Sequence, residues 1–320
     1  MVRIATLSLA AALACATGNA GAQTYPEPGR AIRVVVPFAA GGGTDAVTRI
    51  VAEHVARKWS ASFVIENKAG GGTMIATQSV GAAPADGYTV LAISNSFLVS
   101  PLLAERPPYD PLRDFVTVAP MASSPHVLVV HPSVPATTVA EFAAWAKANP
   151  ARATFASFGR GASNHFGFEV LKRRLGIEIV HAPYGGSAPA LKDLIGGHVP
   201  VMLGDLQNVR EQIGGNLRAL AVANETRLAA LPGVPTMAEA GVPGFTSKSW
   251  FGLVLKAGTD PAIVEKWNAA VREALRDPSV RARLEPHGVT IPDMPVAAFA
   301  AFLVSENEAA HRIAREAGLR

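Results

Sequence analysis

The chain has 320 residues, of which 49% are hydrophobic and 17% are charged, and its net charge at pH 7 is +4. This composition is typical of a globular protein of one or two domains and excludes a disordered or fibrous chain. Basic residues are scattered, and Lys172-Arg173-Arg174 is the only run of three. Without a basic stripe or an RNA-binding aromatic motif, we expect no nucleic-acid partner.

Residues 1–22 have the features of a secretory signal peptide. Arg3 precedes an apolar run at residues 4–16, and Ala20-Gly21-Ala22 places small residues where signal peptidase cleaves. We expect cleavage after Ala22 and export to the periplasm. Cys15, the only cysteine, lies inside this segment and matches a lipid-attachment site poorly. The mature chain is therefore expected to have no disulfide and no thiolate metal site.

After the signal, short apolar segments alternate with segments of helical spacing. We expect strands at residues 33–38, 62–66, 88–93, 127–131, 153–157, 177–180, 199–203, 217–222 and 250–255. We expect helices at residues 45–59, 73–82, 138–148, 163–175, 188–195, 260–275 and 296–317. Alternation of this kind predicts βαβ units, an α/β fold and mostly parallel sheets with flanking helices.

The length and the number of strands suggest two α/β lobes rather than one. Proline- and glycine-containing stretches at 119–125 and 231–249 are the expected crossings between them. We expect residues 23–122 plus 249–320 to form lobe 1 and residues 123–248 to form lobe 2. Two crossings imply a two-strand hinge, with a ligand cleft between the lobes.

The five residues Ala-Gly-Gly-Gly-Thr occur twice, at 40–44 and at 69–73, each time between an expected strand and an expected helix. Such loops gather at the carboxyl ends of parallel strands, where ligands bind. Unpaired N–H groups and the helix dipole favour an anion there, with Thr44 or Asp45 capping one helix and Thr73 the other. Neither loop has the lysine of a phosphate-binding loop, so a carboxylate suits them better. That the glycines form only tight turns stays open.

A third loop, at residues 157–165, offers no catalytic pattern. It lacks the Gly-x-Ser-x-Gly turn of hydrolases. Ser163 and His165 point to different faces of a helix, so they cannot act as nucleophile and base. His165 and Glu169 could share a metal ion but lack a third ligand. We expect no catalysis, no metal and no cofactor.

Eight blocks of sequence carry a resemblance to a known family. They are residues 37–45, 66–72, 109–115, 157–165, 181–184, 193–197, 235–241 and 250–253. In this order the blocks closely resemble the Bug-type periplasmic substrate-binding proteins of tripartite tricarboxylate transporters. The resemblance covers essentially the whole mature chain.

The resemblance implies a two-lobed, type II-like periplasmic binding fold that closes like a flytrap on a small carboxylate. The ligand would be a dicarboxylate, a tricarboxylate, an acidic amino acid or an aromatic acid, and the partner a membrane permease; a monomer is expected. The implied ligand-binding residues of lobe 1 are Phe38, Ala39, Gly41, Gly42, Thr44, Asp45, Ser94 and Asn95. Those of lobe 2 are Ser157, Arg160, Gly161, Ser163, His165, Tyr184, Gly185, Ser187 and Asp205.

Alternatives remain at this point. The protein could be an orphan periplasmic sensor or scavenger of a carboxylate, or an exported enzyme on the same fold. The second Ala-Gly-Gly-Gly-Thr loop either supports the ligand or only packs the lobes together.

The chain also departs from the family pattern. Arg160 stands where a small or amide residue is usual, and Gly185 stands where lysine is common. One hypothesis is that Arg160 pairs with a second acidic group of the ligand; the other is that it lies in solvent. Apolar Phe97 could instead favour an aromatic acid.

Overall fold

The computed structural model describes residues 25–316 and residue 318. The expected signal peptide, with Cys15, lies outside the described residues. Between residues 25 and 316, no helix combines the length and the apolarity that a bilayer crossing requires.

Nine strands of the described chain form one sheet in the order β2-β1-β3-β9-β4-β7-β5-β6, and β8 pairs with β4. The strands are β1 (Ile32–Val36), β2 (Phe63–Asn67), β3 (Thr89–Ser94), β4 (Phe115–Val130), β5 (Thr154–Ser157), β6 (Val180–Pro183), β7 (Val201–Asp205), β8 (Arg218–Val222) and β9 (Lys248–Lys256). The strands away from the middle pair in parallel, as expected. β4 and β9 run antiparallel to all their neighbours.

Helices flank both ends of this sheet. They are α1 (Gly43–Trp59), α2 (Met74–Gly81), α3 (Ser96–Val99), α4 (Val139–Ala148), α5 (Ser163–Leu175), α6 (Ser187–Ile195), α7 (Leu206–Val209), α8 (Pro261–Arg276), α9 (Pro278–Leu284) and α10 (Val296–Glu316). The expectation for α5 agrees with the structure at both ends. The short helices α3, α7 and α9 are not among the expected elements, because so few residues show no clear 3.6-residue period.

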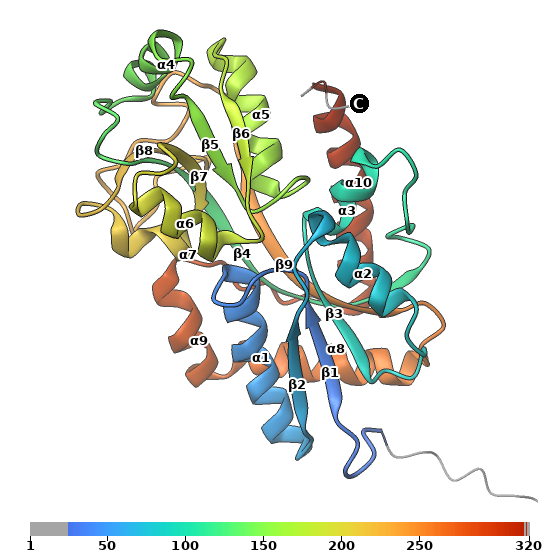
Figure 1. Ribbon diagram of the computed structural model, residues 1–320. Helices are drawn as coiled ribbons and strands as arrows, with labels where there is room; N and C mark the ends of the chain where they lie inside the picture. Colours follow the sequence, from blue (N-terminus) through green and yellow to red (C-terminus); the bar gives the residue numbers. More distant parts are fainter. Residues whose placement is uncertain (1–24, 317, 319–320) are drawn as a thin grey trace, which may run out of the picture.

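The elements gather into two lobes joined by β4 and β9 (Figure 1). The larger apolar clusters follow the same division. Two of them draw on β1, β3, α1, α8 and the adjoining part of β4 and β9. The other two draw on β5, β7, β8, α4 and α5 with the far part of β4. This is the two-lobed architecture that the sequence indicates.

The strand β4 forms the first crossing, and it includes the stretch at residues 119–125 where we expected the chain to pass between the lobes. It pairs with β9 from Phe115 to Pro125 and with β7 from His126 to Val130. Proline disfavours a strand, but the β4–β9 register is irregular between Pro120 and Ala122, where a lost hydrogen bond is tolerated. β4 changes its pairing partner from β9 to β7 a few residues beyond residue 122. The lobe boundaries at 122 and 248 therefore remain a proposal.

The strand β6 is displaced from the expected segment at residues 177–180. Ile177 and Ile179 are buried in the core of the second lobe without joining the sheet, and the strand begins at Val180. Pairing with β5, from Thr154 with Val180 to Ser157 with Pro183, determines this register. The apolar pattern alone could not predict where this strand begins, because the buried residues come directly before the residues that pair with β5.

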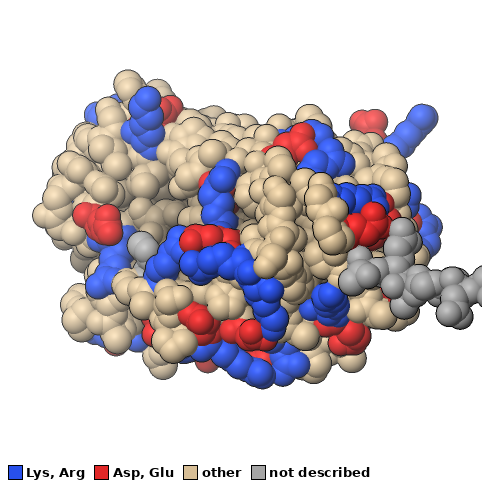
Figure 2. Space-filling view, turned by 90° about the horizontal axis from the view of Figure 1, so that it is seen from below, with Lys and Arg blue, Asp and Glu red and all other residues tan. Residues whose placement is uncertain are grey.

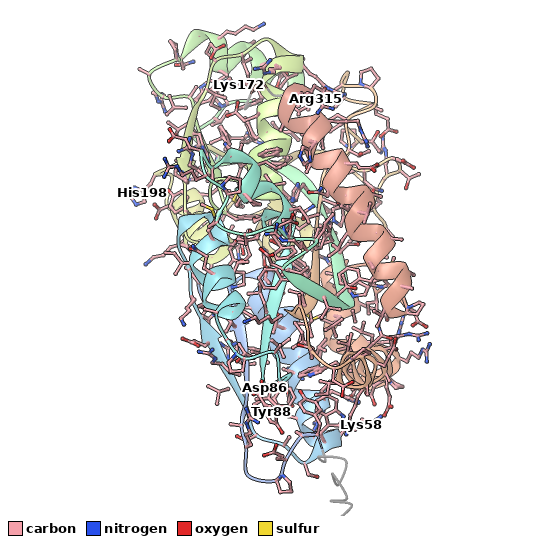
Figure 3. The ribbon with its side chains drawn as sticks, turned by 90° about the vertical axis from the view of Figure 1, so that its right-hand side faces the viewer. Lys58, Asp86, Tyr88, Lys172, His198 and Arg315 are labelled. Carbon is pink, nitrogen blue, oxygen red and sulfur yellow. The ribbon has the colours of Figure 1, made fainter. Side chains whose placement is uncertain are left out.

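The last helix, α10, runs along the molecule and reaches both lobes. Phe299 and Leu303 lie in a core of the first lobe, whereas Ala310 and Ala314 pack against Phe166 of α5. Figure 3 shows Arg315 near Lys172 at the end of the molecule opposite Asp86 and Tyr88. An ion pair at 3.4 Å joins Arg174 of α5 to Glu316.

Charges of both signs are interspersed on the face shown in Figure 2. Ion pairs also join neighbouring helices, for example Arg283 of α9 with Glu53 of α1 at 2.8 Å. The mixture differs from the single-signed patch of a nucleic-acid surface.

Candidate functional site

The amino end of α1 and the carboxyl ends of β3 and β7 meet where the lobes face each other. They surround a cavity of about 20 Å³, which has room for about one water molecule. Most of the polar groups that line this cavity are side-chain hydroxyls, and they come from both lobes and from β9. The lining residues are Phe38, Gly42, Gly43, Thr44, Ser94, Ser96, Phe158, Ala162, Ser163, Ser187, Asp205, Ser249 and Phe251.

The lobes touch directly around this cavity. The N–H of Ala39 donates to the carbonyl of Gly185 at 2.9 Å, and the N–H of Gly43 donates to Ser187 Oγ at 3.2 Å. The small volume and these contacts show that the lobes are in the closed arrangement.

The amino end of α1 offers free hydrogen-bond donors. The helix begins at Gly43, two residues before the expected start, and its N-cap Gly42 makes no side-chain capping bond. Within the described chain, the amides of Thr44 and Asp45 have no hydrogen-bond partner. The expected cap by Thr44 or Asp45 is therefore wrong, because glycine holds the cap position. Free amides at the amino end of a helix can donate hydrogen bonds to an anionic group.

Asp45 holds the first glycine loop in shape rather than facing the cavity. It is 3% exposed, and its carboxylate accepts from Gly41 N at 2.9 Å, Arg49 Nε at 3.0 Å and Asn67 Nδ2 at 2.9 Å. Burial by itself would raise the pKa of Asp45, but these hydrogen bonds lower it below its ordinary value. The side chain therefore stays ionised and fully occupied by the protein.

The second glycine loop packs the lobes together. Gly72 has φ +62°, and a Cβ built there would lie 2.6 Å from the carbonyl oxygen of Arg160 in the other lobe. Gly161 is similar, with φ +81° and 2.5 Å from such a Cβ to Ser100 Oγ. Thr73 precedes α2 but makes no side-chain capping bond, so that expectation is wrong. Its backbone is left-handed, with φ +80°, rather than the extended backbone usual at a cap.

A buried polar cluster lies under the cavity, and its central residue was missed by the sequence analysis. His126 is fully buried, with Nδ1 at 2.8 Å from Ser247 Oγ and Nε2 at 3.1 Å from Ser249 Oγ. Ser163 Oγ lies 2.8 Å from Ser249 Oγ. These residues meet only because β4, β9 and α5 converge, and no local motif links them.

A pair of histidines supports the loop at residues 157–165. The rings of His165 and His181 stack with centroids 4.0 Å apart, and His181 Nε2 lies 2.6 Å from Ser157 Oγ. Burial lowers the pKa of His165 to about 3 and that of His181 to about 4, and the nearby Arg160 adds to both effects. Both rings are neutral at pH 7. They position the loop and supply no charge to a ligand.

A second cavity, of about 440 Å³, lies on the outer side of the first and shares Phe38, Ser96 and Phe158 with it. Arg160, Tyr184 and Gly185 line it together with the second glycine loop. Arg160 is exposed and forms no ion pair with any described residue. It is thus a free cation at the mouth of the cleft.

The expected ligand residues divide into two groups. Phe38, Gly42, Thr44, Ser94, Arg160, Ser163, Tyr184, Gly185, Ser187 and Asp205 line one or both cavities. Ala39, Gly41, Asp45, Ser157, Gly161 and His165 line neither and instead shape the loops. Asn95 faces a third cavity of about 580 Å³ beside α10, and its Oδ1 accepts from Trp250 N at 3.0 Å.

One hypothesis about the ligand is wrong. Phe97 is 1% exposed and packs against Tyr109 and Phe115 inside the first lobe. It does not reach either cavity between the lobes, so it cannot select an aromatic acid. The apolar residues after Asn95 form the short helix α3, whose side chains are all buried.

Among the described residues, no three His, Cys, Asp or Glu side chains come together as a metal site would require. His126, Ser249 and Asp205 are close, but Nε2 of His126 faces both of the others. A catalytic triad uses opposite ring nitrogens for its two partners, so Ser249 and Asp205 do not form one with His126.

Two lobes, a hinge of two strands and a polar cleft between them define the class of periplasmic solute-binding proteins. Comparison with known proteins agrees with this and identifies the family. Residues 47–319 match the family of tripartite tricarboxylate transporter receptors. The chain is 36% identical to BugT of Bordetella pertussis over 290 residues, which is 90% of this chain and 88% of BugT.

Solved structures agree with the family match. The periplasmic binding protein BugD is similar, with a TM-score of 0.87, 32% identity and coverage of 92% of this chain and 99% of BugD. Rpa4515 of R. palustris, solved with adipate, has a TM-score of 0.87, 33% identity and coverage of 91% and 98%. The chain therefore belongs to the family of tripartite tricarboxylate transporter receptors.

Proposed function

We propose that the protein captures a small carboxylate in the periplasm by closing its lobes and presents it to a tripartite tricarboxylate-type permease. The observation that carries this proposal is the pair of unpartnered amides of Thr44 and Asp45 at the amino end of α1. They adjoin a hydroxyl-lined cavity between the lobes. Neutral donors of this kind stabilise an anion without a cationic side chain. Family membership and the adipate bound to Rpa4515 support the same ligand class.

The free guanidinium of Arg160 suits a second acidic group. It lines the outer cavity of about 440 Å³, whereas the α1 amino end lines the inner one. A ligand with a carboxylate at each end would place one carboxylate at the amino end of α1 and the other beside Arg160. Binding would favour the closed arrangement, because residues of both lobes contact the ligand only when the lobes meet.

The test is a thermal-shift screen of mature protein, refolded from denaturant so that no ligand is carried over. The probes are small mono- and dicarboxylates, each with its matched amide. A ligand at a hundredfold over its dissociation constant adds about 2.7 kcal/mol to the free energy of unfolding. We expect acids to raise the melting temperature and their amides to have no effect. Stabilisation by neutral or phosphorylated compounds alone would refute the carboxylate site.

The same screen on Arg160→Ala tests the second acidic group. We expect the variant to lose most of its affinity for dicarboxylates and to keep its affinity for monocarboxylates. Unchanged affinity for every acid would show that Arg160 lies in solvent without contacting the ligand.

A further inference from the structure

The carboxylate of Asp205 faces the inner cavity without a satisfactory partner. Asp205 is 2% exposed and lies at the carboxyl end of β7. Its Oδ1 is buried and makes no hydrogen bond to any described residue, while Oδ2 is 3.4 Å from Asn208 Nδ2. A buried carboxylate oxygen without a donor is costly, so native proteins seldom retain one that nothing fills.

His126 does not supply the missing donor. Its Nε2 lies 3.1 Å from Asp205 Oδ1, but it also lies 3.1 Å from Ser249 Oγ and 3.4 Å from Ser163 Oγ. A ring nitrogen carries at most one hydrogen, and here the geometry of a hydrogen bond is met toward the serines and not toward Oδ1. The cluster thus leaves one acceptor open toward the cavity.

The amino end of α1, where the proposed carboxylate binds, lines the same cavity. Because this cavity is only about 20 Å³, groups bound against either part of its lining lie close together. A bare carboxylate would lie close to the charge of Asp205 and be repelled by it. A ligand whose neighbouring carbon carries an O–H or N–H donor would instead place that donor between the two like charges.

Gln207 adds a donor at the same corner of the second lobe. Its Nε2 is buried without a hydrogen-bond partner and lies against Gly43, which lines the cavity. The segment from the end of β7 into α7 therefore carries a buried unpaired acceptor at Asp205 and a buried unpaired donor at Gln207. A carboxylate oxygen next to a hydroxyl or ammonium group has the complementary pair.

We propose that Asp205 is a specificity residue which selects acids with a hydroxyl or ammonium group on the carbon next to the carboxylate. Its Oδ1 accepts a hydrogen bond from that group. This inference rests on the proposed carboxylate-binding function and names the substrate class within it.

Titration calorimetry on stripped, refolded mature protein tests the inference with two sets of probes. Propionate, lactate and alanine share three carbons, and succinate, malate and aspartate share four; within each set only the substituent next to the carboxylate differs. In the set that binds, we expect the hydroxy or amino acid to bind at least tenfold more tightly than the unsubstituted acid. Equal or tighter binding of the unsubstituted acid would overturn the inference and leave the proposed function intact. If no acid binds, the proposed function fails, and the inference fails with it.

Two substitutions assign the preference to Asp205. In Asp205→Ala we expect the preference to disappear, so that the substituted and the unsubstituted acid bind with similar affinity. Asp205→Asn keeps an acceptor but removes the charge, so it should weaken an amino acid more than a hydroxy acid. The control is Glu178→Ala, which removes an acidic side chain of the same lobe that is 92% exposed. A preference that survives in Asp205→Ala would exclude Asp205 as its source, and the wild-type comparison decides the inference if that variant fails to fold.

Discussion

Gly72 shows how a single residue governs contact between the lobes. Its positive φ is unfavourable for other residues, and its missing side chain makes room for the carbonyl of Arg160 from the other lobe. A side chain at this position would strain the backbone whether the lobes are open or closed. It would clash with the carbonyl of Arg160 only when the lobes are closed. A substitution here therefore separates folding from closure.

We expect Gly72→Ala to lose about 1 kcal/mol of stability from its left-handed backbone and to bind ligand about tenfold more weakly. The matched control is Gly244→Ala, because Gly244 has φ +67° and nothing within 4 Å of a built Cβ. It should lose similar stability and keep its affinity. Urea unfolding and titration calorimetry measure the two quantities, and equal affinities in both variants would contradict a role in closure.

The histidine pair predicts how stability depends on pH. In the folded state the pKa values of His165 and His181 are lowered to about 3 and about 4, while an unfolded histidine titrates near 6.5. Below about pH 6.5 the unfolded chain binds more protons than the folded one. Stability should therefore fall from pH 6.5 to pH 5, by up to about 1.4 kcal/mol per pH unit for each histidine.

Urea unfolding at half-unit steps of pH measures this slope. His181→Gln should reduce the slope, whereas His198→Gln should leave it unchanged because His198 is exposed. A constant free energy of unfolding between pH 6.5 and pH 5 would show that the rings are not buried in the neutral form.

At the scale of elements, α10 is a third link between the lobes beside β4 and β9. Its first half packs in the first lobe through Phe299 and Leu303, and its second half packs on α5 through Ala310 and Ala314. Small residues at this contact allow the two helices to approach closely. The helix thus adds apolar contacts that join the two lobes.

We expect Ala310→Asp to destabilise the protein by about 2 kcal/mol or more, because it places an unpaired charge in an apolar contact. Ala301→Asp is the control; Ala301 lies on the same helix and is exposed, so only the helix propensity changes. Guanidinium unfolding of both variants gives the difference. Equal losses would mean that the end of α10 does not pack on α5 in solution.

At the scale of the whole molecule, the structure is closed although its inner cavity holds only about 20 Å³. A ligand must enter while the lobes are apart, and hydrogen bonds between the lobes, such as Ala39 N to Gly185 O, must break first. The two strands β4 and β9 make the hinge, so the opening is a rotation of compact lobes.

Small-angle X-ray scattering should detect this rotation. A compact chain of roughly 300 residues has a radius of gyration of about 19 Å. We expect the stripped protein to exceed this value and to contract by about 1 Å when a binding carboxylate is added. An identical profile with and without that ligand would contradict closure on binding.

Most elements and the class of the fold could be predicted from the sequence. Helix α5 begins at Ser163 and ends before Gly176, a left-handed C-cap, as its sequence indicates. The three loops were also predicted, because glycine between a strand and a helix is a local signal. The full length of β4 and the position of β6 could not be predicted, since partner strands far away in the chain determine where each one pairs.

The sequence by itself determined which segments are helices and strands, where the glycine loops lie and which family the chain resembles. Each of these depends on neighbouring residues or on the order of motifs. Tertiary structure alone decided that Gly72 meets Arg160, that Phe97 lies in a core, and that His126, Ser249 and Asp205 share one cluster. These contacts join residues far apart along the chain. They arise from strand pairing and from closure of the lobes, and neither leaves a local pattern.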